Sequence, residues 1–317
     1  MAAFLIRRLL LTIPTLLGVT LIVFIIVQVT PGDPAELMLG PMATEEGLKE
    51  LRERLGLDQP IIVQYFTWLG HAVRGDFGRS FKYKRPVSDE LLSKAGNTAI
   101  LVSTAILIAS TAGIGLGLVS SNRPNSRADR VSRLVSSFGV SMPEFWLGIV
   151  LILIFAVQFE LLPTSGMRTP GRTSVEVGDL LMHLILPAVT LATPQCAIVA
   201  RLTRASLVDV MHQDYIRTAR AKGLTESLVF RRHMFRNVLI PLITVIGWQA
   251  GFLLGATILV ETIFAWPGLG QLMVLAVSGR DFPLLQGVTL VVATAVVIIN
   301  ILVDISYALI NPRVRVQ

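Results

Sequence analysis

Residues 9–29 read LLLTIPTLLGVTLIVFIIVQV, an apolar run without a single charged side chain. A helix needs about 20 mostly apolar residues to cross the ~30 Å hydrocarbon core of a bilayer, so this run is long enough to span a membrane. Further runs of similar length follow at residues 98–119, 134–157, 180–200, 238–260 and 284–310. We therefore predict an all-α integral membrane protein with six transmembrane helices.

The composition of the whole chain agrees with this interpretation. Of its 317 residues, 53% are hydrophobic and 15% are charged, with a mean hydropathy of +0.67. Soluble domains carry about 25% charged residues. A single apolar run can also be a buried helix of a soluble protein, but six of them separated by charged segments favour membrane spans. The lone Cys196 cannot form an internal disulfide and argues against a thiolate metal cluster.

The first run follows Arg7 and Arg8, as the apolar part of a secretory signal peptide would. It is too long for such a segment, and no small-residue cleavage pattern follows it. We interpret it as an uncleaved membrane anchor.

Lysine and arginine in short loops predict which ends of the spans face the cytoplasm. The cytoplasmic set lies between the second and third spans, between the fourth and fifth, and in the tail: Arg123, Arg127, Arg130, Arg133, Arg201, Arg204, Arg217, Arg220, Lys222, Arg231, Arg232, Arg236, Arg313 and Arg315. The opposing short loops hold only Arg168, Arg172 and Arg280. Both termini are therefore expected in the cytoplasm.

The large loop after the first span, residues 31–96, is expected outside the cytoplasm. It carries nine basic and ten acidic residues over 66 positions, a length at which the charge rule loses force. Leu48, Leu51 and Leu55 repeat at helical spacing before Gly56, which predicts a short surface helix. The loop either docks a partner or packs as a cap over the bundle.

Catalytic motifs are missing from the sequence. The dipeptide Gly-Lys does not occur, so the chain has no Walker-type phosphate loop, and neither His-Glu-x-x-His nor Gly-x-Ser-x-Gly is present. We expect no catalytic residue, no metal site and no cofactor bound by this chain. A secondary transporter is the main rival class, but it would favour an internal repeat and ionisable groups at mid-membrane, which we do not find.

Ionisable residues within the predicted spans are Glu144, His183 and Asp304. A charge in hydrocarbon costs a few kcal/mol, so each of them is a candidate for lining a pathway. Each also has a structural explanation. Glu144 can be a first-turn acid at the positive end of a helix, His183 lies near the outer start of its run, and Asp304 can reach interfacial water.

Gly247, Gly251 and Gly255 recur every fourth residue in the fifth run. Small residues at this spacing allow another helix to approach closely. Either packing within the chain, a contact with another subunit or a pathway that opens and closes would explain them.

The loop at residues 201–237 has a local charge of +5 and could be a basic helix on lipid headgroups. Residues that typically begin and end helices predict a more defined structure for this loop. We expect a short helix over residues 215–223 that Asp214 caps and Gly223 ends, and a second helix that Thr225 caps, with Glu226 in its first turn. Ala219 and Ala221, beside Arg220 and Lys222, suit a projection that fits a groove on another protein.

This segment, Asp214-Tyr-Ile-Arg-Thr-Ala-Arg-Ala-Lys-Gly-Leu224, followed by His233-x-x-Arg236-Asn237-x-x-Ile240-Pro241, resembles the cytoplasmic signature loop of ABC importer permeases. The similarity is narrower still, to the first, B-type permease subunit of the dipeptide/oligopeptide/nickel transport family. It covers nearly the whole chain through Pro31–Pro34, Leu55–Pro60, Gly75–Gly78, Pro143–Gly148, Leu162–Gly166, Glu261-x-x-Phe264 and Pro267-Gly268.

The resemblance implies the type I ABC importer permease fold, as a single transmembrane domain over residues 1–317 in a bacterial cytoplasmic (inner) membrane. It implies a second, related permease subunit as heterodimeric partner, two ATPase subunits that bind ATP and magnesium, and an extracytoplasmic substrate-binding protein, with no nucleic acid. The coupling helix that contacts the ATPase would comprise Tyr215, Ile216, Arg217, Thr218, Ala219, Arg220, Ala221, Lys222, Gly223 and Leu224.

The sequence departs from general ABC permeases in two places. Thr218-Ala-Arg-Ala221 stands where they have Glu-Ala-Ala, and Pro241 lies farther from the glycine than in their motif. Both differences look typical of the peptide branch. A dipeptide or oligopeptide is the expected solute, with nickel complexes, glutathione and opine-like compounds as alternatives.

Overall fold

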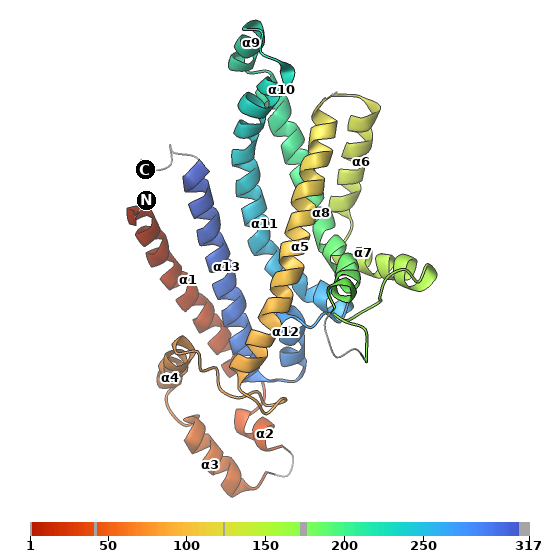
Figure 1. The fold of residues 1–317 in the computed structure, drawn as a ribbon. Helices are drawn as coiled ribbons and strands as arrows, with labels where there is room; N and C mark the ends of the chain where they lie inside the picture. The colour runs from red at the N-terminus through yellow and green to blue at the C-terminus, as the bar shows by residue number, and fades with distance from the viewer. Residues whose placement is uncertain (1, 41–42, 123, 172–175, 311–317) are drawn as a thin grey trace.

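The computed structural model describes residues 2–40, 43–122, 124–171 and 176–310, which form a helical bundle (Figure 1). Arg123, Arg172, Arg313 and Arg315, which the orientation argument used, lie outside the described residues. The described helices are α1 (Ala2–Val29), α2 (Pro34–Leu39), α3 (Glu45–Leu55), α4 (Ile61–Val73), α5 (Val87–Asn122), α6 (Arg127–Ser141), α7 (Glu144–Leu151), η1 (Ile152–Gln158), α8 (Val177–Met211), α9 (Asp214–Ala221), α10 (Glu226–Leu228), η2 (Val229–Phe235), α11 (Arg236–Ile263), α12 (Leu269–Ser278) and α13 (Phe282–Ile310).

Five of these helical stretches are long and apolar enough to cross a membrane, and the bent pair α6–α7 supplies a sixth if it counts as one span. The helices are longer than the apolar runs that predicted them. α5 begins at Val87, well before residue 98, and α8 continues to Met211, well past residue 200. Polar helical turns therefore carry the bundle beyond the apolar runs at both ends.

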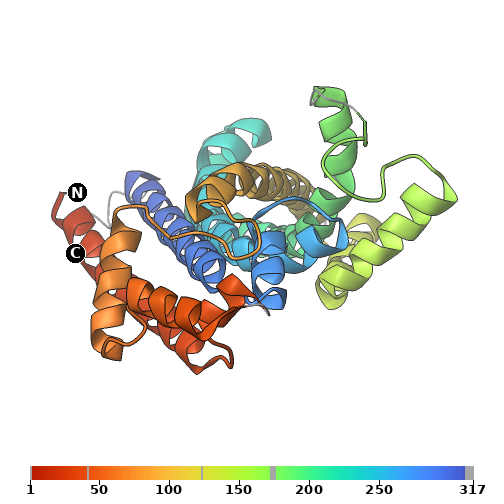
Figure 2. The ribbon, with the colours of Figure 1, turned by 90° about the horizontal axis from the view of Figure 1, so that it is seen from below.

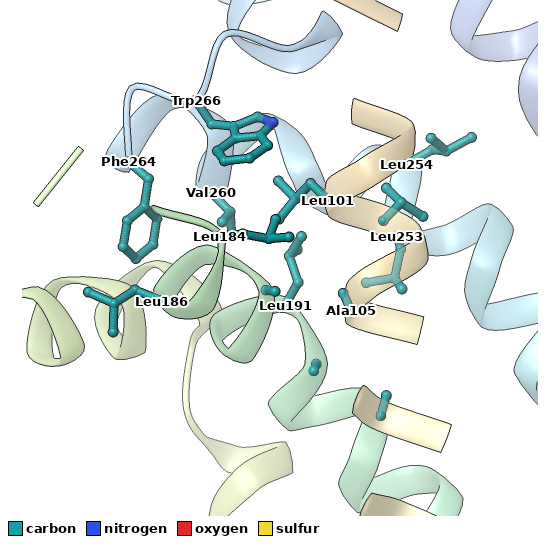
Figure 3. Close-up of a cluster of buried hydrophobic side chains, with 14 of the residues drawn as sticks. Leu101, Ala105, Leu184, Leu186, Leu191, Leu253, Leu254, Val260, Phe264 and Trp266 are labelled. Atoms are coloured by element: carbon teal, nitrogen blue, oxygen red, sulfur yellow. The ribbon is translucent and has the colours of Figure 1, made fainter. Parts of the chain in front are cut away.

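The centre of the bundle is formed by α5, α8 and α11. Their facing side chains form one buried apolar cluster, which Phe264 and Trp266 close at one end (Figure 3). Two glycines let α5 approach α8: a Cβ at Gly113 would lie 2.7 Å from the Cys196 carbonyl oxygen, and one at Gly117 would lie 2.5 Å from the Thr203 Cβ. Any larger residue would push these two helices apart.

The third predicted span is not one straight helix. α6 and the helical pair α7–η1 meet at an angle of 105°. The prediction of one continuous helix over residues 134–157 is therefore wrong. Met142 and Pro143 have extended backbones, with ψ of 127° and 133°. Proline has no amide hydrogen and disfavours the helical conformation in the residue before it, which explains the break.

The segment between α1 and α5 contains the predicted surface helix. α3 covers Glu45–Leu55, with the Thr44 hydroxyl accepting from the Gly47 amide and Gly56 in the left-handed conformation at its end. Asp33 ties this helix to the exit of α1, because its carboxylate accepts a hydrogen bond from Arg52 Nε at 2.7 Å. That hydrogen bond raises the pKa of Arg52 above its usual value. The helix α4 was not predicted.

Residues between α4 and α5 are fastened to the turn before α13. The buried Asp281 carboxylate accepts from the Ser80 hydroxyl and from the Lys82 amide nitrogen at 3.1 Å. Burial, followed by the charges of Glu90 and Asp281, raises the pKa of nearby Tyr83. The long loop is thus packed onto the bundle over part of its length.

The two ends of the bundle differ in content. α1 begins, α13 ends and α9 lies at one end, whereas α2, α3 and α4 lie at the other (Figure 1). This arrangement agrees with the predicted placement of the long loop opposite to the basic loop.

Candidate functional site

The helix α9 projects from the bundle at the tip of the long helices α8 and α11 (Figure 1). It covers Asp214–Ala221, close to the predicted short helix. Gln213, with an extended backbone, occupies the capping position and makes no side-chain cap, so the predicted cap at Asp214 is wrong. Asp214 is instead the first helical residue, where an acid is favoured by the helix dipole, and it pairs with Arg217 at 3.7 Å.

One face of α9 is packed onto the chain itself. Ile216 is fully buried and Ala219 nearly so, within a cluster that α8, η2 and α11 complete. Ala219 is therefore unavailable to a groove on another protein, which corrects the predicted role of its side chain. The buried members of the cluster are Val199, Leu207, Ile216, Ala219, Val229, Met234, Val238 and Leu242, with Leu224 packed at the edge.

The opposite face of α9 is open. Arg217, Thr218, Arg220, Ala221 and Lys222 are exposed, and Tyr215 is 42% exposed. The Tyr215 hydroxyl accepts a hydrogen bond from the Asn237 side-chain amide at 3.0 Å, which connects this face to the start of α11. The predicted coupling residues thus divide into an exposed basic surface and a buried anchor.

Gly223 makes the turn that follows α9. Its φ of +75° is in the left-handed region, and no heavy atom lies within 4 Å of where a Cβ would stand, so the backbone conformation is what requires glycine. The Gly223 amide donates to the Arg220 carbonyl oxygen at 2.9 Å. The predicted glycine turn is confirmed.

A bidentate ion pair closes this turn. Arg220 donates from Nε to Glu226 Oε1 at 2.8 Å and from Nη2 to Oε2 at 3.3 Å, so α9 and α10 are joined across Gly223. Thr225 directly precedes the second helix, and its carbonyl oxygen accepts from the Leu228 and Val229 amides. Its hydroxyl forms no hydrogen bond to the helix, so the predicted side-chain cap is wrong. The second helix then continues as the π-helical η2 into α11.

A buried carboxylate, missed in the sequence, braces the same end of the bundle. Asp129 of α6 accepts from Arg204 of α8 at 2.7 and 3.0 Å, from the Asn125 amide at 2.8 Å and from the Ser120 hydroxyl of α5. In the sequence, Arg204 indicates only a positive charge in a cytoplasmic loop, whereas in the structure it is the partner of Asp129. Ser126-Arg-Ala-Asp129 is a capping pattern that could have located this acid in a first helical turn.

Comparison with known proteins identifies the architecture. Residues 113–316 match the family described as binding-protein-dependent transport system inner membrane component, and residues 1–102 match the N-terminal family of the same membrane components. The chain belongs to this family. It is the permease subunit of an ABC importer, a multi-pass membrane protein of a transporter class that works with ATPase subunits.

Similar permeases and solved structures agree with this assignment. The chain is 41% identical over 316 residues to the oligopeptide transport system permease protein AppB of Bacillus subtilis (strain 168), covering 99% of this chain and 100% of the relative. It is 43% identical over 315 residues to the glutathione transport system permease protein GsiC of Escherichia coli (strain K12), covering 99% of each.

The fold is shared with more distant transporters. A structure of the MetNI methionine ABC transporter in an inward-facing conformation aligns with a TM-score of 0.57 at 16% identity, over 70% of this chain and 96% of that one. An amino acid ABC transporter crystallised with histidines aligns with a TM-score of 0.54 at 17% identity, over 69% and 94%. These likenesses support the predicted type I importer permease fold.

The three ionisable residues predicted within the spans, His183, Asp304 and Glu144, differ in their burial and contacts. His183 is buried, and its Nδ1 lies 2.9 Å from the Asp179 carbonyl oxygen one turn earlier in α8. Asp304 of α13 forms an ion pair with Arg8 of α1. Glu144 is the first residue of α7, as the alternative for that residue proposed, and is partly buried.

Glu261, one residue past the predicted fifth span, is a buried acid that was not among the predicted intramembrane groups. It is fully buried near the end of α11, where its carboxylate accepts from the Thr98 hydroxyl at 2.7 Å and from the Gln271 amide at 3.0 Å. Gly268 passes directly over this carboxylate, so a Cβ there would collide with it. Glu261 thus joins α5, α11 and α12.

The glycines of the fifth span do not share one environment. A Cβ at Gly247 would collide with Val303 of α13, and one at Gly251 would stand 3.6 Å from the Asn300 Oδ1. Gly255 faces open space instead. Packing within the chain therefore explains Gly247, whereas a Cβ at Gly251 would make only an ordinary van der Waals contact.

No metal site accompanies these acids: within the described ranges, no group of three or more His, Cys, Asp or Glu side chains is arranged to hold an ion.

Proposed function

We propose that this permease forms the membrane path for a peptide-like solute and that α9 is the element on which a partner ATPase acts. The named substrates of two similar permeases, an oligopeptide in one and glutathione in the other, support a peptide-like cargo. Nickel complexes and opine-like compounds are the alternatives within the same machinery.

The working complex in this proposal contains a second, related permease subunit, two ATPase subunits and an extracytoplasmic binding protein. ATP and magnesium bind to the ATPase subunits, and this chain has no catalytic residue of its own. Alternating access of the two permease subunits then moves the solute, while the binding protein selects it.

The observation that carries the coupling role is the two-sided packing of α9. Its exposed face offers Arg217, Thr218 and Lys222 to a partner, whereas Ile216 and Ala219 fix its other face to α8 and α11. Close-packed interiors transmit displacement because they deform little. A push on α9 would therefore move the ends of two membrane helices together.

Substitution of Gly223 tests this role. We expect Gly223→Asp to abolish ATP-driven uptake with the protein still in the membrane, because a Cβ at φ +75° strains the backbone and a carboxylate there would compete with Glu226 for Arg220, so that the α9–α10 turn would change. Gly171→Asp is the matched control, since Gly171 has φ +89° and equally open surroundings, outside the segment 201–237. Normal uptake by a well-expressed Gly223→Asp complex would disprove the coupling assignment.

A separate measurement addresses the solute. The complete complex in proteoliposomes, with its binding protein, should show ATP hydrolysis that increases with dipeptides or oligopeptides. Stimulation by glutathione alone, or by nickel complexes alone, would replace the proposed cargo while leaving the coupling role intact.

A further inference from the structure

The helix α4, Ile61–Val73, is an apolar helix that lies across the bundle and outside its core. Figure 1 shows it end-on and Figure 2 shows it along its length, so its axis runs roughly perpendicular to the long helices. Its 13 residues extend for about 20 Å at 1.5 Å per residue, which is too short to cross a ~30 Å hydrocarbon core. An apolar helix of this length must therefore be shielded from water in some other way than by crossing the membrane.

Contacts with α1 fix the depth at which α4 lies. The Tyr65 hydroxyl is 2.9 Å from the Thr20 hydroxyl, and the Tyr65 ring lies 5.4 Å from the Phe24 ring. The Gln28 side-chain amide donates to the Gln64 side chain at 2.8 Å. The apolar span of α1 ends at Val29, so Thr20 lies about 14 Å before that end at 1.5 Å per residue. α4 is thus level with one half of a membrane span, not with the water beyond it.

The outward face of α4 is a continuous apolar stripe. Ile62, Phe66 and Val73 are 71%, 63% and 79% exposed, and Leu69 completes the i, i+4, i+7, i+11 series between them. The polar Gln64 and His71 lie on another side, where they line a cavity of about 820 Å³ between α1, α3, α4 and α13. The helix therefore separates an apolar outer face from a polar inner one.

The helix α1 also exposes apolar side chains at the depth where α4 packs against it. Ile22, Ile25 and Ile26 of α1, at the level of the α4 contacts, are each about half exposed. The charged helix α3 lies farther from the bundle than α4 (Figure 1). Along the direction from the membrane centre to the water on this side, the apolar α4 therefore packs beside the span of α1, and the charged α3 lies beyond it.

We propose that α4 is an interfacial membrane helix whose stripe, Ile62, Phe66, Leu69 and Val73, is immersed in phospholipid acyl chains of the leaflet on the α2–α4 side. Burial of apolar side chains at the acyl-chain boundary is what holds such helices in place. Tyr65 and Trp68 have the aromatic, partly polar side chains that membrane interfaces favour. The inference rests on α1 being a membrane span and not on the identity of the solute.

Fluorescence quenching in the complete reconstituted complex tests this placement. The chain has one cysteine, so Cys196→Ala in a complex whose other cysteines are replaced gives a background in which Phe66→Cys can carry an NBD label. We expect blue-shifted emission that loses most of its intensity with lipids doxyl-labelled at carbon 5 and little with aqueous iodide. Val73→Cys on the same stripe provides a second label if the first disturbs assembly.

Glu50→Cys on α3 is the matched water-exposed control and should show the opposite pattern. Iodide quenching at residue 66 as strong as at residue 50 would overturn the proposal, because the stripe would then face water. Protection from both quenchers would overturn it as well, because a protein partner would then cover the stripe.

Discussion

Glu261 illustrates how much one buried side chain holds together in this permease. Its carboxylate accepts from Thr98 of α5 and from Gln271 of α12. Glu261→Ala would leave the buried Thr98 hydroxyl and the partly buried Gln271 backbone amide without an acceptor, at about 1–3 kcal/mol each. We therefore expect the variant to lose about 2–6 kcal/mol of stability, seen as a lower unfolding temperature of the purified complex.

The neighbouring Thr262→Ala is the control for this substitution. Thr262 is exposed and its hydroxyl bonds only to the Ile258 carbonyl of its own helix, so the complex should unfold within a few degrees of the unmodified one. Equal unfolding temperatures for both variants would contradict the bracing role of Glu261.

Single residues were predictable from the sequence where the backbone alone dictates them. Gly223 could be placed at a turn because it follows a helical pattern, and its positive φ confirms that placement. Glu261 could not be assigned a partner, since Thr98 and Gln271 come from other helices. The split of α9 into an exposed and a buried face likewise depends on α8 and α11, which local sequence does not specify.

At the scale of elements, two glycines of α11 make a matched pair. Gly247→Ala would place a methyl group against Val303 of α13, and overpacking of this kind costs about 1–3 kcal/mol. Gly255→Ala meets open space and should gain up to about 1 kcal/mol of helix propensity. Thermal unfolding of the two complexes should therefore shift in opposite directions.

The same pair separates packing within the chain from contact with another subunit. If Gly255→Ala leaves unfolding of this chain unchanged but reduces copurification of the second permease, Gly255 lies at a subunit contact. A stabilised Gly247→Ala complex would show that α13 does not pack on α11 as described.

Elements with strong periodicity or clear end signals were predictable, and breaks were not. α3 was found from its leucine spacing and its final glycine. The bend between α6 and α7 was missed because residues 134–157 were taken as one apolar run, although Pro143 and Glu144 interrupt that run where the more polar α6 gives way to the apolar α7. α4 was not predicted because its 13 apolar residues are too few to cross a membrane, and a short apolar run in a loop does not by itself indicate a helix.

At the scale of the molecule, the permease has a basic end with α9 and a mixed-charge end with α2–α4 (Figure 1). The two ends are connected by α5, α8 and α11, which pack closely against one another through Gly113, Gly117 and Glu261. We infer that the basic end faces the cytoplasm, because positively charged loops are retained on that side.

Accessibility of single cysteines tests this orientation in intact cells. In the Cys196→Ala background, Lys222→Cys on the exposed side of the turn after α9 and Glu50→Cys on α3 place thiols at opposite ends of the bundle. A membrane-impermeant maleimide should label residue 50 in intact spheroplasts and residue 222 only after the membrane is opened. Labelling of residue 222 in intact spheroplasts would reverse the orientation, and with it the access of a cytoplasmic ATPase to α9.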